Sequence, residues 1–219
     1  MRRFRFSAAG LLLIAITVAG VLTAPGCIGF TSHVLWWMGA DIDPAEFDGL
    51  EGQTVAVVCE SPDSAYGPDS ETEAVAREVE KILRYKVSRI TMIRYDQVAA
   101  WMDRNGSHEI DFRAIGKGVK ADRVVAVKLK SFSVHENTTL YQGKADYELA
   151  VYDVASGDVV YDDQEPDFQY PTKDAYHMTE MSEAKFQREF IRWLSADIAR
   201  RFHSNELPQY FEKERTIQQ

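Results

Sequence analysis

The chain has 219 residues, of which 25 are lysine or arginine and 34 are aspartate or glutamate, giving a formal net charge of −9. A protein that mainly binds nucleic acid or anionic lipid needs a cationic surface, and such an acidic composition argues against one. The roughly 190 residues that follow the N-terminal segment are enough to build a single sizeable core. Composition therefore predicts one globular domain whose main partner is neither nucleic acid nor anionic lipid.

The N-terminal segment has the pattern of an export signal. Arg2, Arg3 and Arg5 precede an uncharged apolar run, Leu11–Leu22, and small residues then lead to Cys27. This order predicts a signal peptide over residues 1–26, with the arginines on the cytoplasmic side and the rest of the chain outside the cytoplasm. An uncleaved membrane anchor and an ordinary secretion signal remain open as alternatives, although Pro25 and Gly26 interrupt the apolar run.

The sequence Thr23-Ala24-Pro25-Gly26-Cys27 resembles the end of bacterial lipoprotein signal peptides, in which a cysteine follows small residues and receives a diacylglyceryl group. The resemblance implies that Cys27 carries a lipid and becomes the first residue of the mature chain. It also implies a place on the periplasmic face, with the outer membrane preferred to the inner one. With Cys27 acylated, Cys59 is expected to be buried as a small hydrophobic residue.

Residues 27–51 are expected to form the lipid anchor and a linker. Within them, Trp36 and Trp37 suit either a membrane interface or packing against the domain. The domain itself is expected over residues 52–203, and a polar tail over residues 204–219.

The first half of the domain alternates strand and helix patterns. A β-branched run predicts a buried strand, and Ser70 with Glu73 predicts a capping box that opens an amphipathic helix. The expected elements are strands at Thr54–Cys59 and Ile90–Ile93, the helix from Ser70, a short helix at Asp96–Trp101, and a helix capped by Asp111 and ending at Gly118. This order favours parallel pairing of the first two strands.

The second half has the alternation of an antiparallel sheet. Strands are predicted at Val124–Val134, with a β-bulge near Ser131, at Leu140–Asp153, and at Val159–Tyr161. A connection, Asp162–Met181, then precedes a helix expected over Ser182–Phe202, whose apolar stripe must lie on the sheet. The predicted fold is α/β with α+β character in the second half. It has a mixed sheet of about five strands, helices on its faces, and the long C-terminal helix across the sheet.

The order of elements from Gly52 to Phe202 resembles the CsgG-type and LpoB-type lipoproteins of the bacterial envelope. The features that carry the resemblance are the strand Thr54–Cys59, the helix from Ser70, the short helix and glycine-containing junction Asp111–Asp122, and the turn Tyr152–Gly157 before the last strand. The resemblance implies an envelope protein without catalytic activity that binds another protein as an adaptor or regulator. The alternative is an oligomeric structural or secretion component. The chain is also similar to uncharacterised exported lipoproteins of planctomycete-type bacteria, which implies no mechanism.

Catalytic and metal-binding patterns are weak. Ser182 and Lys185 fit the spacing S-x-x-K, but the companion motifs of penicillin-recognising enzymes are missing, so Ser182 is interpreted as a helix cap. The five histidines have no metal-ligand spacing. An acidic cluster from Asp162 to Asp167 lacks the glycine and terminal glutamate of a calcium-binding loop and is interpreted as a solvated turn. We therefore expect no enzyme activity, no cofactor, no metal and no small-molecule substrate.

The predicted partner is an envelope protein, in addition to the membrane reached through the lipid on Cys27. Long connections within compact domains are often functional, and this one carries aromatic residues. The candidate partner-binding residues are Phe168, Tyr170, Tyr176 and His177, although packing over the sheet is an alternative for the aromatic rings. Lys128, Lys130 and Lys144 could form a second, basic surface for an acidic partner, or an ordinary solvated sheet face.

Overall fold

The computed structural model describes residues 42–62, 70–105 and 111–206. The chain divides into two compact units, one made of Met1–Ile42 with Glu206–Gln219 and the other of Asp43–Asn205. The second unit is called the domain below. The predicted signal peptide, Cys27 and the two adjacent tryptophans lie outside the described residues. No helix within the described part is long and apolar enough to cross a membrane.

The domain is built around one sheet with the strand order β3-β2-β4-β5-β6, and β7 pairs with β5 beside this path. Two short strands, β1 and β8, form a separate pair. The strands are β1 (Ile42–Asp43), β2 (Thr54–Glu60), β3 (Thr91–Met92), β4 (Arg123–His135), β5 (Leu140–Asp153), β6 (Val159–Tyr170), β7 (Tyr176–His177) and β8 (Asn205–Glu206). The helices are α3 (Ser70–Lys86), α4 (Tyr95–Asn105), α5 (Phe112–Val119), α6 (Glu183–Ala199) and the short 3-10 helix η2 (Arg200–Phe202).

The sheet is mixed, as the sequence predicts. Strand β2 runs parallel to both β3 and β4, whereas β4, β5 and β6 are antiparallel to their neighbours. The register of β4 on β5 shifts between Leu129 and Ser131, which confirms the predicted β-bulge. Side chains on β5 alternate between the two faces, with those from Tyr141 to Val151 at every second position buried.

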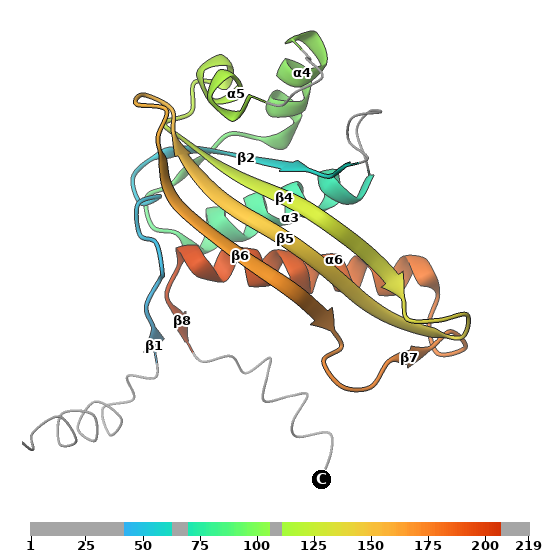
Figure 1. Cartoon of the computed structure of the whole chain (residues 1–219). Helices are drawn as coiled ribbons and strands as arrows, with labels where there is room; N and C mark the ends of the chain where they lie inside the picture. Colours follow the sequence, from blue (N-terminus) through green and yellow to red (C-terminus); the bar gives the residue numbers. More distant parts are fainter. Residues whose placement is uncertain (1–41, 63–69, 106–110, 207–219) are drawn as a thin grey trace, which may run out of the picture. The chain divides into compact units, whose positions relative to one another are not determined.

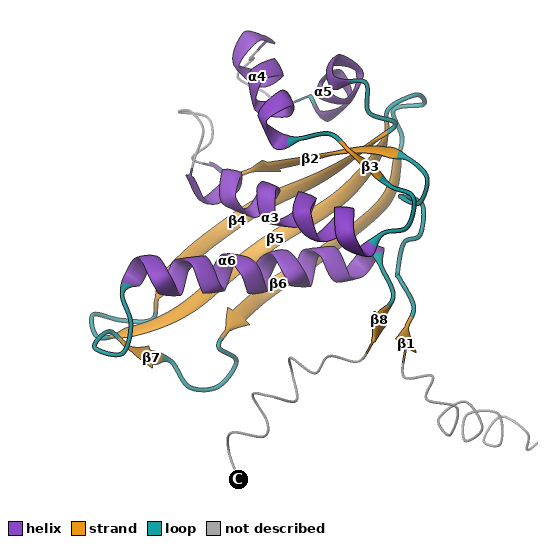
Figure 2. Cartoon of the chain, turned by 180° about the vertical axis from the view of Figure 1, so that it is seen from behind, coloured by secondary structure: helices purple, strands orange, loops and turns teal. Residues whose placement is uncertain are grey.

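Helices cover the two faces of the sheet unequally. Helices α3 and α6 lie across one face, which we call the inner face, and bury the larger core there (Figure 2). Cys59 belongs to this core, as expected for a small hydrophobic residue. Helices α4 and α5 pack on the opposite, outer face, against side chains such as Ala56 and Val124 of β2 and β4. The outer face of β5 and β6 therefore has little helical cover (Figure 1).

Helix α5 begins where its sequence predicts. The carboxylate of Asp111 accepts a hydrogen bond from the backbone N–H of Ala114 at 3.0 Å, as an N-cap should. The helix ends at Val119, one residue after the predicted Gly118, and the C-cap residue Lys120 has a φ of 61°, in the left-handed region. The Lys120 N–H donates to the carbonyl groups of Gly116 and Lys117, so the last turn is closed by the backbone.

The junction after α5 ties β4 to β2. The carboxylate of Asp122 accepts the N–H of Thr54 at 2.8 Å, and the Asp122 N–H donates to the Thr54 carbonyl at 2.7 Å. A side chain on Gly116 would place its Cβ 2.4 Å from a methyl group of Val154, so only glycine lets α5 approach the sheet this closely.

Three local expectations differ from the structure. Ser70 is the first residue of α3, its hydroxyl donates to Glu71, and Glu73 pairs with Arg77, so the capping box does not form. Ser182 is the N-cap residue of α6, but its side chain makes no capping hydrogen bond. Part of the segment expected as a linker packs on the domain, because Leu50 has no exposed surface.

The largest difference concerns the connection expected from Asp162. Strand β6 continues to Tyr170, and β7 follows at Tyr176, so most of the expected loop belongs to the sheet. The acidic residues at the start of this stretch are therefore strand residues and do not form a solvated turn.

Candidate protein-binding surface

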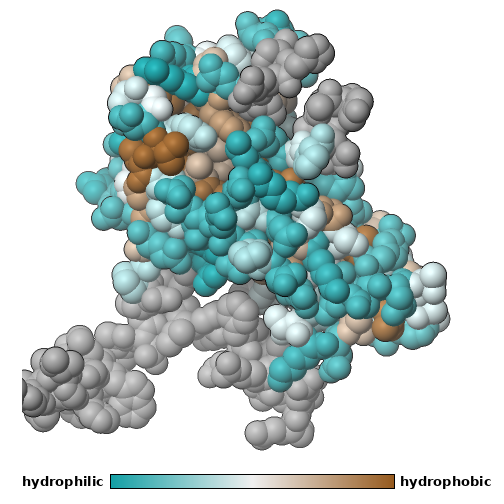
Figure 3. Space-filling model, in the orientation of Figure 1, coloured by the Kyte–Doolittle hydropathy of each residue, from teal (hydrophilic) through white to brown (hydrophobic). Residues whose placement is uncertain are grey.

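The outer face of β4, β5 and β6 carries mostly charged and polar side chains (Figure 3). The three lysines on this face are each paired with a glutamate. Lys128 contacts Glu60 at 3.3 Å, Lys130 contacts Glu148 at 2.9 Å, and Lys144 contacts Glu136 at 2.6 Å. The lysines therefore follow the alternative of a solvated sheet face, because neighbouring carboxylates balance their charges.

An apolar patch interrupts this polar face where β6 begins. Val159 is 48% exposed and Val160 is 40% exposed, and hydrophobic atoms gather at this end of the outer face (Figure 3). Tyr152, the partner of Val159 in the register, is half-buried and stacks on Phe112 with 5.2 Å between ring centroids. We call Val159, Val160 and Tyr152 the valine patch. Exposed apolar side chains beside one another are typical of a surface that binds another protein.

The two valines lie at a bulge of β6. Val159 pairs with Tyr152 and Tyr161 pairs with Val151, so Val160 has no partner position on β5. The sequence predicts a strand at these residues and assigns no site to them. Their exposure follows from the bulge and from the position of β6 at the edge of the sheet.

Strand β6 has an edge that pairs with no other strand in the described part of the chain. Its register on β5 is regular from Tyr161 to Glu165 and shifts on either side of that stretch. Pro166 follows, and Asp167 has a φ of 62°, which marks a bulge. The N–H and C=O groups of every second residue in β6 therefore point away from the sheet over a short stretch.

Asp146 on β5 stabilises both bulges beside it. Its carboxylate accepts the N–H of Asp167 at 2.8 Å and the hydroxyl of Ser131 at 2.7 Å. These two hydrogen bonds lower the pKa of Asp146 below its ordinary value, because they favour the ionised carboxylate. The bulge that ends the regular part of β6 is thus fixed by a charged side chain.

The acidic side chains of β6 divide between the two faces. Asp163 and Glu165 point inward and contact the guanidinium of Arg201 at 3.0 and 2.8 Å. Arg201 is 2% exposed and also contacts the Asp197 carboxylate at 2.8 Å. Asp162 lies on the outer face, is exposed, and has no ion-pair partner among the residues that the structure describes.

Tyr147 completes the group around Arg201. Its hydroxyl donates to Asp197 at 2.6 Å, and the guanidinium carbon of Arg201 lies 5.7 Å from the ring centroid. Burial, followed by the charge of Asp197, raises the pKa of Tyr147 above its ordinary value, so the hydroxyl stays a neutral donor. The Arg201 group therefore holds together strand β5, strand β6 and the end of α6.

The four residues predicted to bind a partner lie at the far end of β6 and in β7, and three of them, Phe168, Tyr170 and Tyr176, pack with the core of the inner face. Tyr170 is buried and stacks on Trp193 of α6 at 5.1 Å, and Phe168 stacks on Phe190 at 6.1 Å. Tyr176 is half-buried and meets Phe186 edge-on at 6.0 Å, whereas His177 is exposed. The rings thus follow the packing alternative, and a role of these residues in partner binding stays a prediction.

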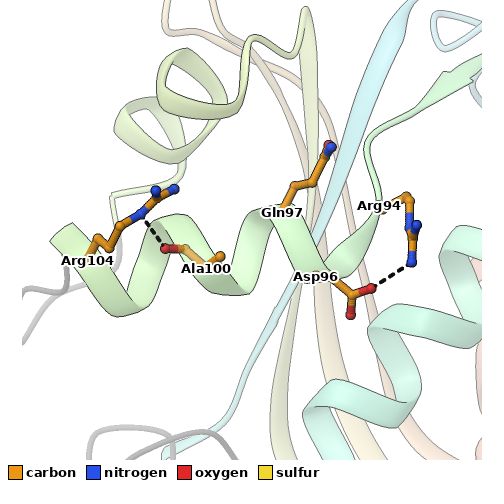
Figure 4. A pocket seen from close by; sticks show the side chains of 5 residues that line it. All are labelled: Arg94, Asp96, Gln97, Ala100 and Arg104. Carbon is orange, nitrogen blue, oxygen red and sulfur yellow. Dashed lines mark hydrogen bonds and ion pairs between the residues drawn. The ribbon is translucent and has the colours of Figure 1, made fainter.

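A hollow on α4 is lined by charged side chains that bind one another (Figure 4). Arg94 contacts Asp96 at 2.9 Å, and Arg104 donates to the carbonyl of Ala100 at 2.8 Å. The strongest influence on Asp96 is its hydrogen bond from Arg77, which lowers the pKa of the carboxyl group. Within the described ranges, no group of three or more histidines, cysteines, aspartates or glutamates could hold a metal ion.

No protein-family profile and no curated protein matches the sequence. Among solved structures, the chain is similar to lipoprotein GNA1162 of Neisseria meningitidis, with a TM-score of 0.42, 12% identity, and coverage of 67% of this chain and 97% of that chain. It is similar to the PelC dodecamer of Paraburkholderia phytofirmans, with a TM-score of 0.41, 13% identity, and coverage of 74% and 98%. It is also similar to the LpoB C-terminal domain of Salmonella enterica, with a TM-score of 0.36, 13% identity, and coverage of 54% and 84%. We draw neither family nor function from similarities at this level.

Proposed function

We propose that the chain is a membrane-tethered envelope protein without catalytic activity, which binds another protein through the valine patch. The observation that carries this proposal is the exposure of Val159 and Val160 beside a strand edge that has no partner strand in the described part. At a sheet edge, exposed apolar side chains offer a partner hydrophobic area, and the backbone of the edge strand offers it hydrogen-bonding groups. The ion pairs on the rest of the outer face are typical of a polar rim that stays in contact with solvent around such a binding patch.

The tether we propose is a lipid on Cys27, on the periplasmic face and with the outer membrane preferred. The full chain, produced in a related bacterium, is expected in the membrane fraction with an intact mass that begins at Cys27 and includes acyl chains. A Cys27→Ser variant should lack this species, since the thiol that accepts the lipid is gone. A wild-type mass that retains Met1, or one cut without lipid, would contradict the anchor.

The protein-binding role is tested by photo-crosslinking in intact cells. With p-benzoylphenylalanine in place of Val160, we expect one discrete adduct with a second envelope protein, identified by mass spectrometry. The matched control carries the same probe in place of Tyr85 on α3, which is 80% exposed. That control should give no such adduct, because α3 packs over β2, on the far side of the sheet from β6.

Other outcomes separate the alternatives. An adduct of twice the chain's own mass at Val160 would favour the oligomeric structural or secretion component. Equal adducts from both probe positions, or none from Val160, would contradict binding at the valine patch.

A further inference from the structure

We propose that the partner contributes a basic, amphipathic β-strand that adds to the free edge of β6 between Tyr161 and Glu165. This inference rests on the proposed function and specifies how the partner binds. Backbone groups of β6 supply the hydrogen bonds of an added strand, and the valine patch supplies an apolar contact at its end.

The length of the added strand follows from the register. Strand β6 pairs with β5 in an unbroken register over Tyr161–Glu165 and again over Phe168–Tyr170, so the longer regular stretch of its free edge is the first of these. Beyond it, Pro166 has no N–H to donate, and the left-handed backbone of Asp167 turns the strand. An added strand is therefore limited to a short segment.

The charge of the partner strand follows from the side chains of β6. Asp162 is exposed and has no ion-pair partner within the described residues. Asp163 and Glu165 keep 32% and 34% of their side-chain surface exposed while they share one guanidinium, that of Arg201. On an added amphipathic strand, lysine or arginine side chains that share the outer face would meet Asp162, whereas acidic side chains on either face would be repelled by the carboxylates of β6.

The same charges argue against a second copy of this chain as the occupant of the edge. Two β6 strands side by side would bring Asp162, Asp163 and Glu165 of both copies together. Acidic residues and a proline on an edge strand are features that prevent edge-to-edge self-association. We therefore assign the edge to a basic segment of a different protein.

The test uses the full chain in detergent and a synthetic peptide of alternating lysine and valine, about seven residues long. We expect the peptide to slow amide hydrogen exchange in β6, measured by mass spectrometry, and to leave exchange in α4 unchanged. Two control peptides separate the contributions. One replaces lysine by glutamate, and the other keeps every side chain but has methylated backbone nitrogens that cannot donate hydrogen bonds.

Two protein variants with the same change of charge complete the design. Asp162→Lys should weaken binding of the lysine peptide by about tenfold, measured by fluorescence anisotropy, because an attraction becomes a repulsion. Asp103→Lys, on the exposed surface of α4, should leave binding unchanged.

The proposal is overturned if the lysine peptide gives no protection in β6 at a concentration of about 1 mM. It is also overturned if the methylated peptide binds equally well, since binding would then need no added strand, or if both variants weaken binding alike. A partner adduct at Val160 without peptide binding would refute this mode and leave the proposed function standing. No partner adduct at Val160 would refute the proposed function itself.

Discussion

Arg201→Met is expected to lower the free energy of unfolding by about 3–5 kcal/mol, the cost of leaving buried charges without their partner. The guanidinium is 2% exposed and contacts three carboxylates, those of Asp163, Glu165 and Asp197. Burial alone would lower the pKa of Arg201, yet the neighbouring carboxylates, Asp197 first among them, raise it, so the side chain stays charged. Methionine preserves much of the volume and removes only the charge and the hydrogen bonds.

The matched control for this variant is Arg200→Met, one residue earlier. Arg200 also contacts the Asp197 carboxylate, at 2.8 Å, but 43% of its side chain is exposed. Exposed ion pairs contribute at most about 1 kcal/mol, so this variant should remain close to wild type. Urea unfolding followed by circular dichroism measures both. Equal losses from the two variants would contradict the role assigned to the buried Arg201 group.

The sequence predicted most of the fold because its periodicities are local. The alternation in Leu140–Asp153 requires one covered and one solvated face, and the structure buries every second residue of β5. The change of apolar phase along β4 likewise located the bulge at Ser131, which depends only on the order of residues in one strand. The capping residue Asp111 likewise indicated where α5 begins.

The extent of β6 could not be predicted in the same way. Aspartate, glutamate and proline disfavour strands, and Asp162–Pro166 contains little else. What holds Asp163 and Glu165 in a strand is Arg201, which lies more than thirty residues later and is brought to them by α6. A contact over that separation leaves no local pattern, so the sequence of this segment indicates a turn.

The candidate site depended on tertiary pairing even more. The spacing of the lysines in β4 and β5 indicates a basic surface when each strand is considered alone. In the folded sheet, however, each lysine has a glutamate from another part of the chain beside it. The aromatic residues at Phe168 and Tyr170 were candidates for partner binding, and the added length of β6 turns them toward α6. The valine patch likewise depends on the position of β6 at the edge of the sheet, which no local pattern indicates.

Gly143→Val is expected to destabilise the domain by about 1–3 kcal/mol, although valine is the better strand residue. A Cβ at position 143 would lie 2.2 Å from the ring of Phe190, which has no exposed surface and is held between Phe132 and Phe168. Strand propensity favours valine by about 1 kcal/mol at most, so the steric conflict is the larger effect and the variant should be less stable than the wild type. Lys144→Val, on the outer face of the same strand, gains that propensity without the conflict and should be nearly neutral.

A double variant identifies the cause of the loss at position 143. If the ring of Phe190 is the obstacle, Gly143→Val should cost much less in a Phe190→Leu background than in the wild type, because leucine leaves the space that the valine methyl groups need. The two changes should therefore couple by about 0.5–3 kcal/mol in a thermodynamic cycle measured by urea unfolding. Additive losses would mean that the ring moves aside freely, and that the contact between Gly143 and Phe190 does not fix α6 on the sheet.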